Sequence, residues 1–200
     1  QQPWKVPTHE VYSVMRAGLV LPVEKHTPMV RAYLEAARGC AERKPLDQAR
    51  VVVTGSFCEQ PPIGLIKTLE RAGCYIVDDD YVQVHRFIEG DIRTDGDPLE
   101  NLVRAFLDQA IASPTRYVEL GNKGQALVDR VKKNAAEGVL FCAASFCDPA
   151  LLDQPMAVKA VDEAGIPWTA FKYSENGGQF QVIREQAGTF ADSIKLWSEA

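Results

Sequence analysis

The sequence predicts an α/β protein with a mostly parallel, four-stranded sheet and a helical N-terminal lead-in. Four runs of apolar residues alternate along the chain with amphipathic helical patterns, the order that builds a parallel sheet by right-handed crossovers. The 200 residues are 46% hydrophobic and 24% charged, which suffices for one sizeable core.

Residues 1–48 are expected to form a helical lead-in from a preceding domain, and residues 49–200 a C-terminal α/β domain. The chain has no initiator methionine and three prolines within its first 22 residues, so we expect it to be part of a longer protein. From Pro28 to Arg43 apolar residues recur at helical spacing. This pattern predicts a helix with Thr27 as its N-cap and Pro28 at its first position.

The first two strands flank a short helix. Arg50–Val53 leads into "TGSFCEQPP", a β-branched run that ends in a Gly/Ser turn, as is typical of a strand buried on both faces. The apolar pattern from Ile63 to Leu69 predicts a helix that stops at Gly73, a C′ glycine. "CYIVDDD", residues 74–80, is expected to be the second strand.

Two helices are expected before the third strand. Apolar residues from Leu99 to Ile111 predict a long amphipathic helix that Ser113 and Pro114 stop. A further helix is expected from Lys123 to Ala136, followed by the strand "GVLFCAASF" at residues 138–146.

The last part of the chain repeats the alternation. Asp148 and Pro149 are typical of an N-cap and a first helical position, and the helix should run to Gly165. "IPWTAFKY", residues 166–173, is the fourth strand, and the spacing from Phe180 to Trp197 predicts a terminal helix. The expected fold class is therefore doubly wound, Rossmann or flavodoxin-like.

Charge and composition exclude several classes of function. The formal net charge is −5 and no basic stripe is interleaved with aromatics, so nucleic acid is not an expected partner. No apolar run approaches the roughly 18 residues that span a bilayer, and the start lacks a signal-peptide pattern, so we expect no membrane partner and a cytoplasmic location. The odd count of 5 cysteines favours reduced thiols.

Ligands of doubly wound sheets bind beyond the carboxyl ends of the strands, so the residues that close each strand are the candidates. These are Ser56, Phe57 and Cys58; Asp78, Asp79 and Asp80; Phe146, Cys147 and Asp148; and Tyr173, Ser174 and Glu175. Ser56, Phe57 and Glu175 are the substrate-binding candidates among them. The three aspartates fit either a magnesium pocket or, by our preference, a capped and solvated turn.

His85 and Arg86 follow the second strand in a long polar loop. They are candidates to position an anionic thioester substrate or to donate protons. The alternative is that they pair with nearby acids such as Glu89. "GSFCEQPP" matches neither the dinucleotide nor the P-loop fingerprint, so ATP and dinucleotides are not bound by those motifs.

Cys147 is the leading candidate for a metal ligand. It falls at a strand exit, open to the crevice and before a helix N-terminus, where the helix dipole favours a thiolate. Cys142 lies mid-strand, and for both residues the alternative is a buried thiol that packs. A self-contained zinc site is disfavoured because four residues separate these thiols and no histidine is near. A full iron–sulfur ligand set would need Cys40 or Cys74, which we expect to pack in the core.

The stretches "VVVTGSFCEQPP", "AGCYIVDDD" and "GVLFCAASFCDP" resemble the ATP-dependent benzoyl-CoA reductase subunits, a branch of the 2-hydroxyacyl-CoA dehydratase family. The resemblance runs from about Pro7 to the end, and the first two stretches are similar to the reductase branch in particular. Subunits of this family are longer, with an N-terminal α/β domain, so the chain resembles a carboxyl half.

The resemblance implies a [4Fe-4S] cluster held by three cysteines, two from the N-terminal domain and one at the position of Cys147. Cys58 belongs to the reductase-type motif without an implied ligand role, and Cys58 and Cys142 remain secondary candidates. By the same resemblance, the partners are a homologous second subunit, an ATP-hydrolysing iron–sulfur activator and ferredoxin as upstream donor. The half-chain alone is expected to lack the cluster and to be inactive.

Two reactions follow from the resemblance, and the residues do not separate them. The reductase branch reduces the ring of benzoyl-CoA to a cyclic dienoyl-CoA, and the dehydratase branch removes water from a 2-hydroxyacyl-CoA by a radical route. A different class, a non-catalytic α/β binding or signalling module, would need an acidic pair after the first strand and an aspartate after the third. This chain has Ser-Phe-Cys and Phe-Cys there.

Overall fold

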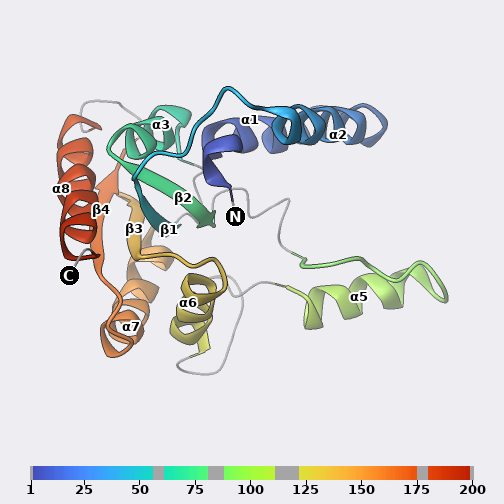
Figure 1. The fold of residues 1–200 in the computed structure, drawn as a ribbon. Helices are drawn as coiled ribbons and strands as arrows, with labels where there is room; N and C mark the ends of the chain where they lie inside the picture. The colour runs from blue at the N-terminus through green and yellow to red at the C-terminus, as the bar shows by residue number, and fades with distance from the viewer. Residues whose placement is uncertain (1, 56–60, 81–87, 111–121, 175–179, 199–200) are drawn as a thin grey trace.

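The computed structural model describes residues 2–55, 61–80, 88–110, 122–174 and 180–198. Its centre is one parallel sheet built from β1 (Ala49–Thr54), β2 (Cys74–Asp79), β3 (Gly138–Ala144) and β4 (Trp168–Tyr173). The strand order is β2-β1-β3-β4, which confirms the doubly wound class (Figure 1). The order reverses between β1 and β3, so the carboxyl ends of these two strands mark the crevice where such sheets bind ligands.

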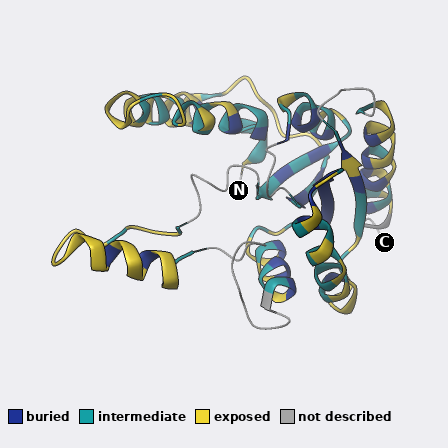
Figure 2. Ribbon diagram, turned by 180° about the vertical axis from the view of Figure 1, so that it is seen from behind, coloured by how far each residue is buried: buried dark blue, intermediate teal, exposed yellow. Residues whose placement is uncertain are grey.

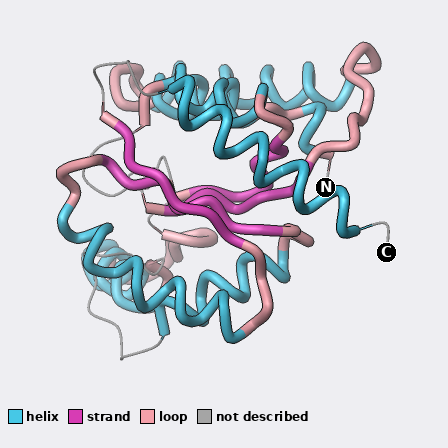
Figure 3. Tube along the Cα trace, turned by 90° about the vertical axis from the view of Figure 1, so that its left-hand side faces the viewer, coloured by secondary structure: helices cyan, strands magenta, loops and turns pink. Residues whose placement is uncertain are grey.

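Helices cover both faces of the sheet (Figure 3). One face carries α1 (Thr8–Ala17), α3 (Ile63–Arg71) and α8 (Phe180–Ser198). The other carries α6 (Asn122–Lys133) and α7 (Asp148–Glu163). Alternate strand residues supply the two cores because side chains of a strand point to opposite faces. Val51, Val53, Leu140 and Cys142 belong to the first core, and Val52, Val139 and Phe141 to the second.

The lead-in differs from the sequence expectation. Helix α1 follows a 3₁₀ turn at Pro3–Lys5 and was not predicted, yet its Tyr12 is a buried member of the first core. Helix α2 spans Val23–Gly39 with Pro22 as N-cap, so the predicted start at Thr27 and Pro28 was wrong. Pro28 lies inside the helix because a proline near the N-terminus removes only one intrahelical hydrogen bond, and Pro22 provides an earlier start.

The remaining elements lie close to the predicted positions. Helix α3 ends before Gly73, whose φ of +95° confirms the left-handed C′ glycine. Helix α5 spans Pro98–Asp108, so it ends before Ile111, and its predicted stop at residues 113–114 lies outside the described residues. Within the described ranges, no helix has the length and apolar character needed to cross a bilayer.

The predicted cap of α7 was wrong by one residue. Cys147 is the N-cap, and Asp148 and Pro149 are the first two helical residues. The difference places the candidate thiol at the junction of strand and helix. Asp148 in the first turn still interacts favourably with the helix dipole.

Candidate site at the carboxyl edge of the sheet

The exit of β1 is held against its two neighbouring strands. Gly55 has a φ of +112°, and a Cβ at this position would lie 3.0 Å from the carbonyl oxygen of Cys142 on β3. The Gly55 N–H donates to Asp80 Oδ2 at 2.6 Å, and the Thr54 hydroxyl donates to the same oxygen at 3.1 Å. The turn that leads into "SFCEQPP" therefore starts from a position where only glycine fits without strain.

The aspartates at the end of β2 serve the fold. Asp78 Oδ2 accepts hydrogen bonds from Arg130 Nε at 2.8 Å and from Asn134 Nδ2 at 3.1 Å. Burial lowers the pKa of Arg130, but the hydrogen bond and charge of Asp78 outweigh it, so the net shift is upward. Asp78 and, at the β1 exit, Asp80 thus both have structural partners, which favours the turn over the magnesium pocket. The described residues contain no group of three His, Cys, Asp or Glu that could hold a metal ion.

Cys147 lies at the exit of β3, at the edge predicted for ligands, but its side chain is not open to the crevice. The residue is 3% exposed and belongs to the first core together with Ala150. Its N–H donates to the Ala144 carbonyl at 3.0 Å, which closes a tight turn between β3 and α7. This turn directs the chain back toward the sheet, so the thiol is buried where we had expected exposure.

The other described thiols behave as packing residues. Cys142 is fully buried in the middle of β3, in the same core as Cys147. Burial raises the pKa of Cys74 to about 12, so this thiol stays protonated at neutral pH. Cys40 is half-buried at the end of α2.

Phe146 is the most exposed large apolar side chain of the described residues, at 93%. It directly precedes Cys147 in the turn at the end of β3. Sequence reasoning named it only as a strand-closing residue. Its exposure offers an aromatic face beside the crevice.

Tyr12 and Arg16 connect α1 to this edge, and sequence reasoning missed both. The Tyr12 hydroxyl donates to the Pro61 carbonyl at 2.6 Å, and Arg16 Nη1 donates to the Tyr12 oxygen at 2.9 Å. The Arg16 guanidinium also lies 5.2 Å from the centre of the Tyr12 ring. The spacing of Thr8, Tyr12 and Met15 was the signal that could have revealed the buried face of α1.

Most of the remaining sequence candidates lie outside the described residues. These are Ser56, Phe57, Cys58, His85, Arg86 and Glu175. The ends of β1 and β3 share one edge because these strands are parallel, and Thr54 pairs with Phe141. The edge predicted for Cys58 and Cys147 thus exists, with only Cys147 described on it.

A cavity of about 500 Å³ lies elsewhere, beside the first half of β2. Trp4, Arg43, Lys67 and Tyr75 are among its lining residues. It is open between the lead-in and the amino end of β2, away from the strand exits. We therefore place the candidate site at the carboxyl edge and not in this cavity.

Comparison with known proteins agrees with the resemblance of the strand-exit motifs. The family model described as 2-hydroxyglutaryl-CoA dehydratase, D-component, matches residues 1–194. The chain belongs to this family. Its membership confirms the resemblance drawn from the strand-exit motifs.

The chain is more similar in sequence to a reductase subunit than to two dehydratase subunits of the family. The chain is 56% identical to a benzoyl-CoA reductase subunit of Thauera aromatica over 99% of this chain and 51% of that protein. It is 27% identical to the (R)-phenyllactyl-CoA dehydratase beta subunit of Clostridium sporogenes over 94% of this chain and 49% of that protein. The beta subunit of (R)-2-hydroxyglutaryl-CoA dehydratase from Acidaminococcus fermentans is 23% identical over 97% of this chain and 51% of its own length. The chain thus spans about half the length of the curated relatives it matches.

Proposed function

We propose that the chain is half of an iron–sulfur subunit of a benzoyl-CoA reductase, which reduces the ring of an aromatic acyl-CoA to a cyclic dienoyl-CoA. The observation that carries the proposal is the 56% identity to a reductase subunit, against 27% and 23% to two dehydratase subunits. In this subunit, residues 1–48 are the lead-in from a preceding domain and residues 49–200 the C-terminal α/β domain.

Cys147 is the residue of this chain that would hold a [4Fe-4S] cluster. A thiolate is the ligand that such clusters use, and Cys147 is the cysteine at the exit of β3, as the N-cap of α7. The described residues supply one thiol at this edge, so the chain fits the role of one ligand among several, the others coming from the rest of the subunit. When bound, the cluster supplies single electrons at low potential. Cys58 and Cys142 are secondary candidates.

The acyl-CoA would lie across the strand exits. Phe146 offers its exposed ring to the aromatic acyl group, since stacked or edge-to-face rings attract each other. Ser56, Phe57 and Glu175 are proposed as further substrate contacts. His85 and Arg86 would position the thioester or donate protons to the reduced ring.

The electron supply would come from partner proteins in the cytoplasm. We propose a homologous second subunit, an ATP-hydrolysing iron–sulfur activator and ferredoxin as its donor. The sequence contains neither of the two phosphate-binding fingerprints, which agrees with ATP being used by a separate component.

A dehydratase that removes water from a 2-hydroxyacyl-CoA is the second candidate, supported by the family model and the dehydratase relatives. The test is to assemble the complete subunit anaerobically with its partner and activator, and to offer benzoyl-CoA or a 2-hydroxyacyl-CoA with ATP and a reductant. We expect the enzyme to consume benzoyl-CoA in an ATP-dependent reaction and to leave the 2-hydroxyacyl-CoA unchanged. Dehydration of the 2-hydroxyacyl-CoA would establish the second candidate, and turnover of neither would favour a non-catalytic module.

A further inference from the structure

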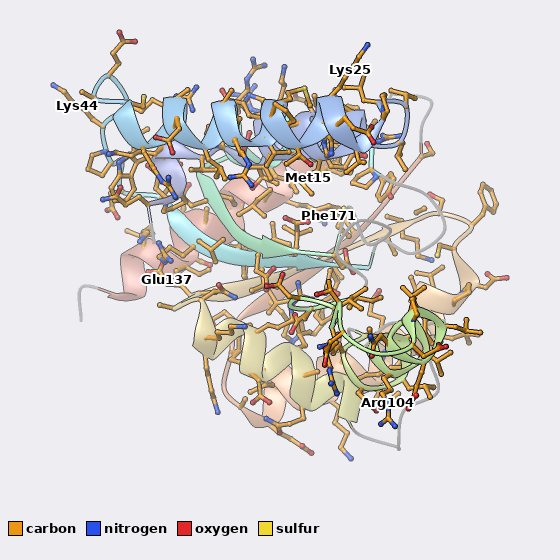
Figure 4. The ribbon with its side chains drawn as sticks, turned by 90° about the vertical axis from the view of Figure 1, so that its right-hand side faces the viewer. Met15, Lys25, Lys44, Arg104, Glu137 and Phe171 are labelled. Atoms are coloured by element: carbon orange, nitrogen blue, oxygen red, sulfur yellow. The ribbon has the colours of Figure 1, made fainter. Side chains whose placement is uncertain are left out.

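Residues 88–110 form an arm that stands apart from the sheet (Figure 1). Ile88 and Ala110 form an antiparallel bridge at its base, and the Glu89 N–H donates to the Gln109 carbonyl at 2.9 Å. Helix α5 is its outer part. Figure 4 shows Arg104 of α5 at the opposite end of the sheet from Glu137, which directly precedes β3.

The buried side of α5 faces the arm's own extended segment and is small and polar. Asn101 is 8% exposed, and its Nδ2 donates to the Asp95 carbonyl at 2.6 Å. Ala105, one turn further along, is also buried. The Asp97 carboxylate caps the helix by accepting from the Glu100 N–H at 2.8 Å. The arm thus has its own hydrogen-bonded framework.

The opposite side of α5 is an apolar stripe, and Figure 2 shows this helix as mostly exposed. Its residues recur at helical spacing and are each about half exposed or more: Leu99 70%, Leu102 52%, Val103 48%, Phe106 55% and Leu107 56%. A helix normally turns such a stripe toward a core. Here the two buried residues, Asn101 and Ala105, are polar or small, and the large apolar side chains are exposed, an arrangement that marks an interaction surface.

We infer that the other half of the same subunit polypeptide covers this stripe. The inference rests on the proposed function in one respect, that the chain is half of a longer subunit, as its 51% coverage of the reductase relative indicates. A tethered half has a high effective concentration and reaches the stripe before a separate molecule does. Helix α2 projects from the same side of the molecule as α5 (Figures 1 and 2). Val20 and Val23, around the start of α2, are exposed apolar residues as well.

The net negative charge of the arm indicates which charge the covering surface should carry. The arm carries six acidic residues, Glu89, Asp91, Asp95, Asp97, Glu100 and Asp108, and two arginines, Arg93 and Arg104. Both arginines already form ion pairs within the arm, with Asp95 and Glu100. The covering half should therefore present an apolar centre with a basic rim. Two arms meeting face to face would oppose like charges, which argues against a second copy.

The test is carbene footprinting of the complete subunit, purified anaerobically without its partner. Labelling of residues 98–108 is compared with labelling around Leu196, an equally apolar helix residue that is 77% exposed. We expect the α5 segment to be labelled about tenfold less than the Leu196 segment at all protein concentrations. The double variant Leu99→Glu/Leu102→Glu should restore labelling at Val103, and Leu196→Glu should leave the α5 segment unchanged.

The other outcomes overturn the inference. Protection that arises only when the second subunit is added would make the stripe a subunit interface. Protection that rises with protein concentration would indicate a second copy, and strong labelling under all conditions would leave the stripe uncovered. Footprinting needs neither cluster nor turnover, so an inactive enzyme with a protected α5 would refute the proposed function and keep this inference.

Discussion

The carboxylate of Asp80 accepts a hydrogen bond from the backbone N–H of Gly55 at 2.6 Å, and so joins the exit of β2 to the exit of β1. On its other side, Gly55 lies against the Cys142 carbonyl of β3. The ends of β1 and β2 and the middle of β3 thus meet at one glycine, and the loop with the reductase-type motif begins there.

Replacing Gly55 by alanine should lower the free energy of unfolding by roughly 2–4 kcal/mol, because the methyl group adds left-handed backbone strain and a clash with a backbone carbonyl. Urea denaturation of the 200-residue chain measures this loss. Gly90→Ala is the matched control, since Gly90 has a φ of +83° and open space around its Cβ position. It should cost about 1 kcal/mol. Equal losses in the two variants would show that the contact with β3 contributes nothing.

Tyr12→Phe should destabilise the fold by roughly 1–3 kcal/mol, because the buried Pro61 residue loses the donor to its carbonyl. The control is Tyr75→Phe, which removes an exposed hydrogen bond from the Leu46 N–H and should cost less than about 0.5 kcal/mol. Chemical denaturation monitored by circular dichroism compares the variants. A Tyr12→Phe protein as stable as wild type would mean that the hydrogen bond from α1 to Pro61 does not stabilise the fold.

The ion pair of Glu10 and Arg43 predicts acid sensitivity. The hydrogen bond from Arg43 holds the pKa of Glu10 below its ordinary value of 4.5. Because the folded-state pKa is the lower one, the stabilisation is present above the unfolded value and is lost as pH falls through the folded value. Melting temperatures should therefore fall less steeply below about pH 5 in Glu10→Gln than in wild type, by a small margin at this partly exposed site. Parallel curves would contradict the pairing.

Cys147→Ala and Cys142→Ala separate ligation from packing in the complete subunit. Both thiols are buried in one core, so each substitution should cost a similar amount of stability, on the order of 1 kcal/mol. Only Cys147→Ala should abolish cluster retention and ATP-driven reduction of the acyl-CoA. Iron content and turnover are the readouts. Equal loss in both variants would mean that the strand-exit argument selected the wrong thiol, and full activity in Cys147→Ala would remove the cluster from this domain.

The 200-residue chain alone should bind no stoichiometric cluster, because one thiol at the site forfeits the chelate effect. Iron and sulfide analysis after anaerobic reconstitution checks this. About four irons per chain with a cluster absorbance would show that the half-chain supplies its own ligands.

Periodicity alone determined the strands, most of the helices and the position of the carboxyl edge at which we propose the site. The runs at β1 and β3 are apolar on both faces, and only a parallel sheet with helices on each side buries both. The family could also be inferred from the sequence, because each strand-exit motif is one continuous stretch of the chain. Helix α1 escaped prediction because prolines surround it and its buried face comprises few residues.

Tertiary contacts decided what a single residue does. The Thr8 hydroxyl donates to the Ile76 carbonyl 68 positions away, and no local pattern encodes such a contact. The burial of Cys147 depends on how the turn after β3 folds back onto a core assembled from distant helices. Likewise, the helical spacing of α5 was evident in the sequence, but the exposure of its stripe follows from the arm segment that packs on the opposite side, at Asn101. Periodicity identifies a face, and only packing determines what that face meets.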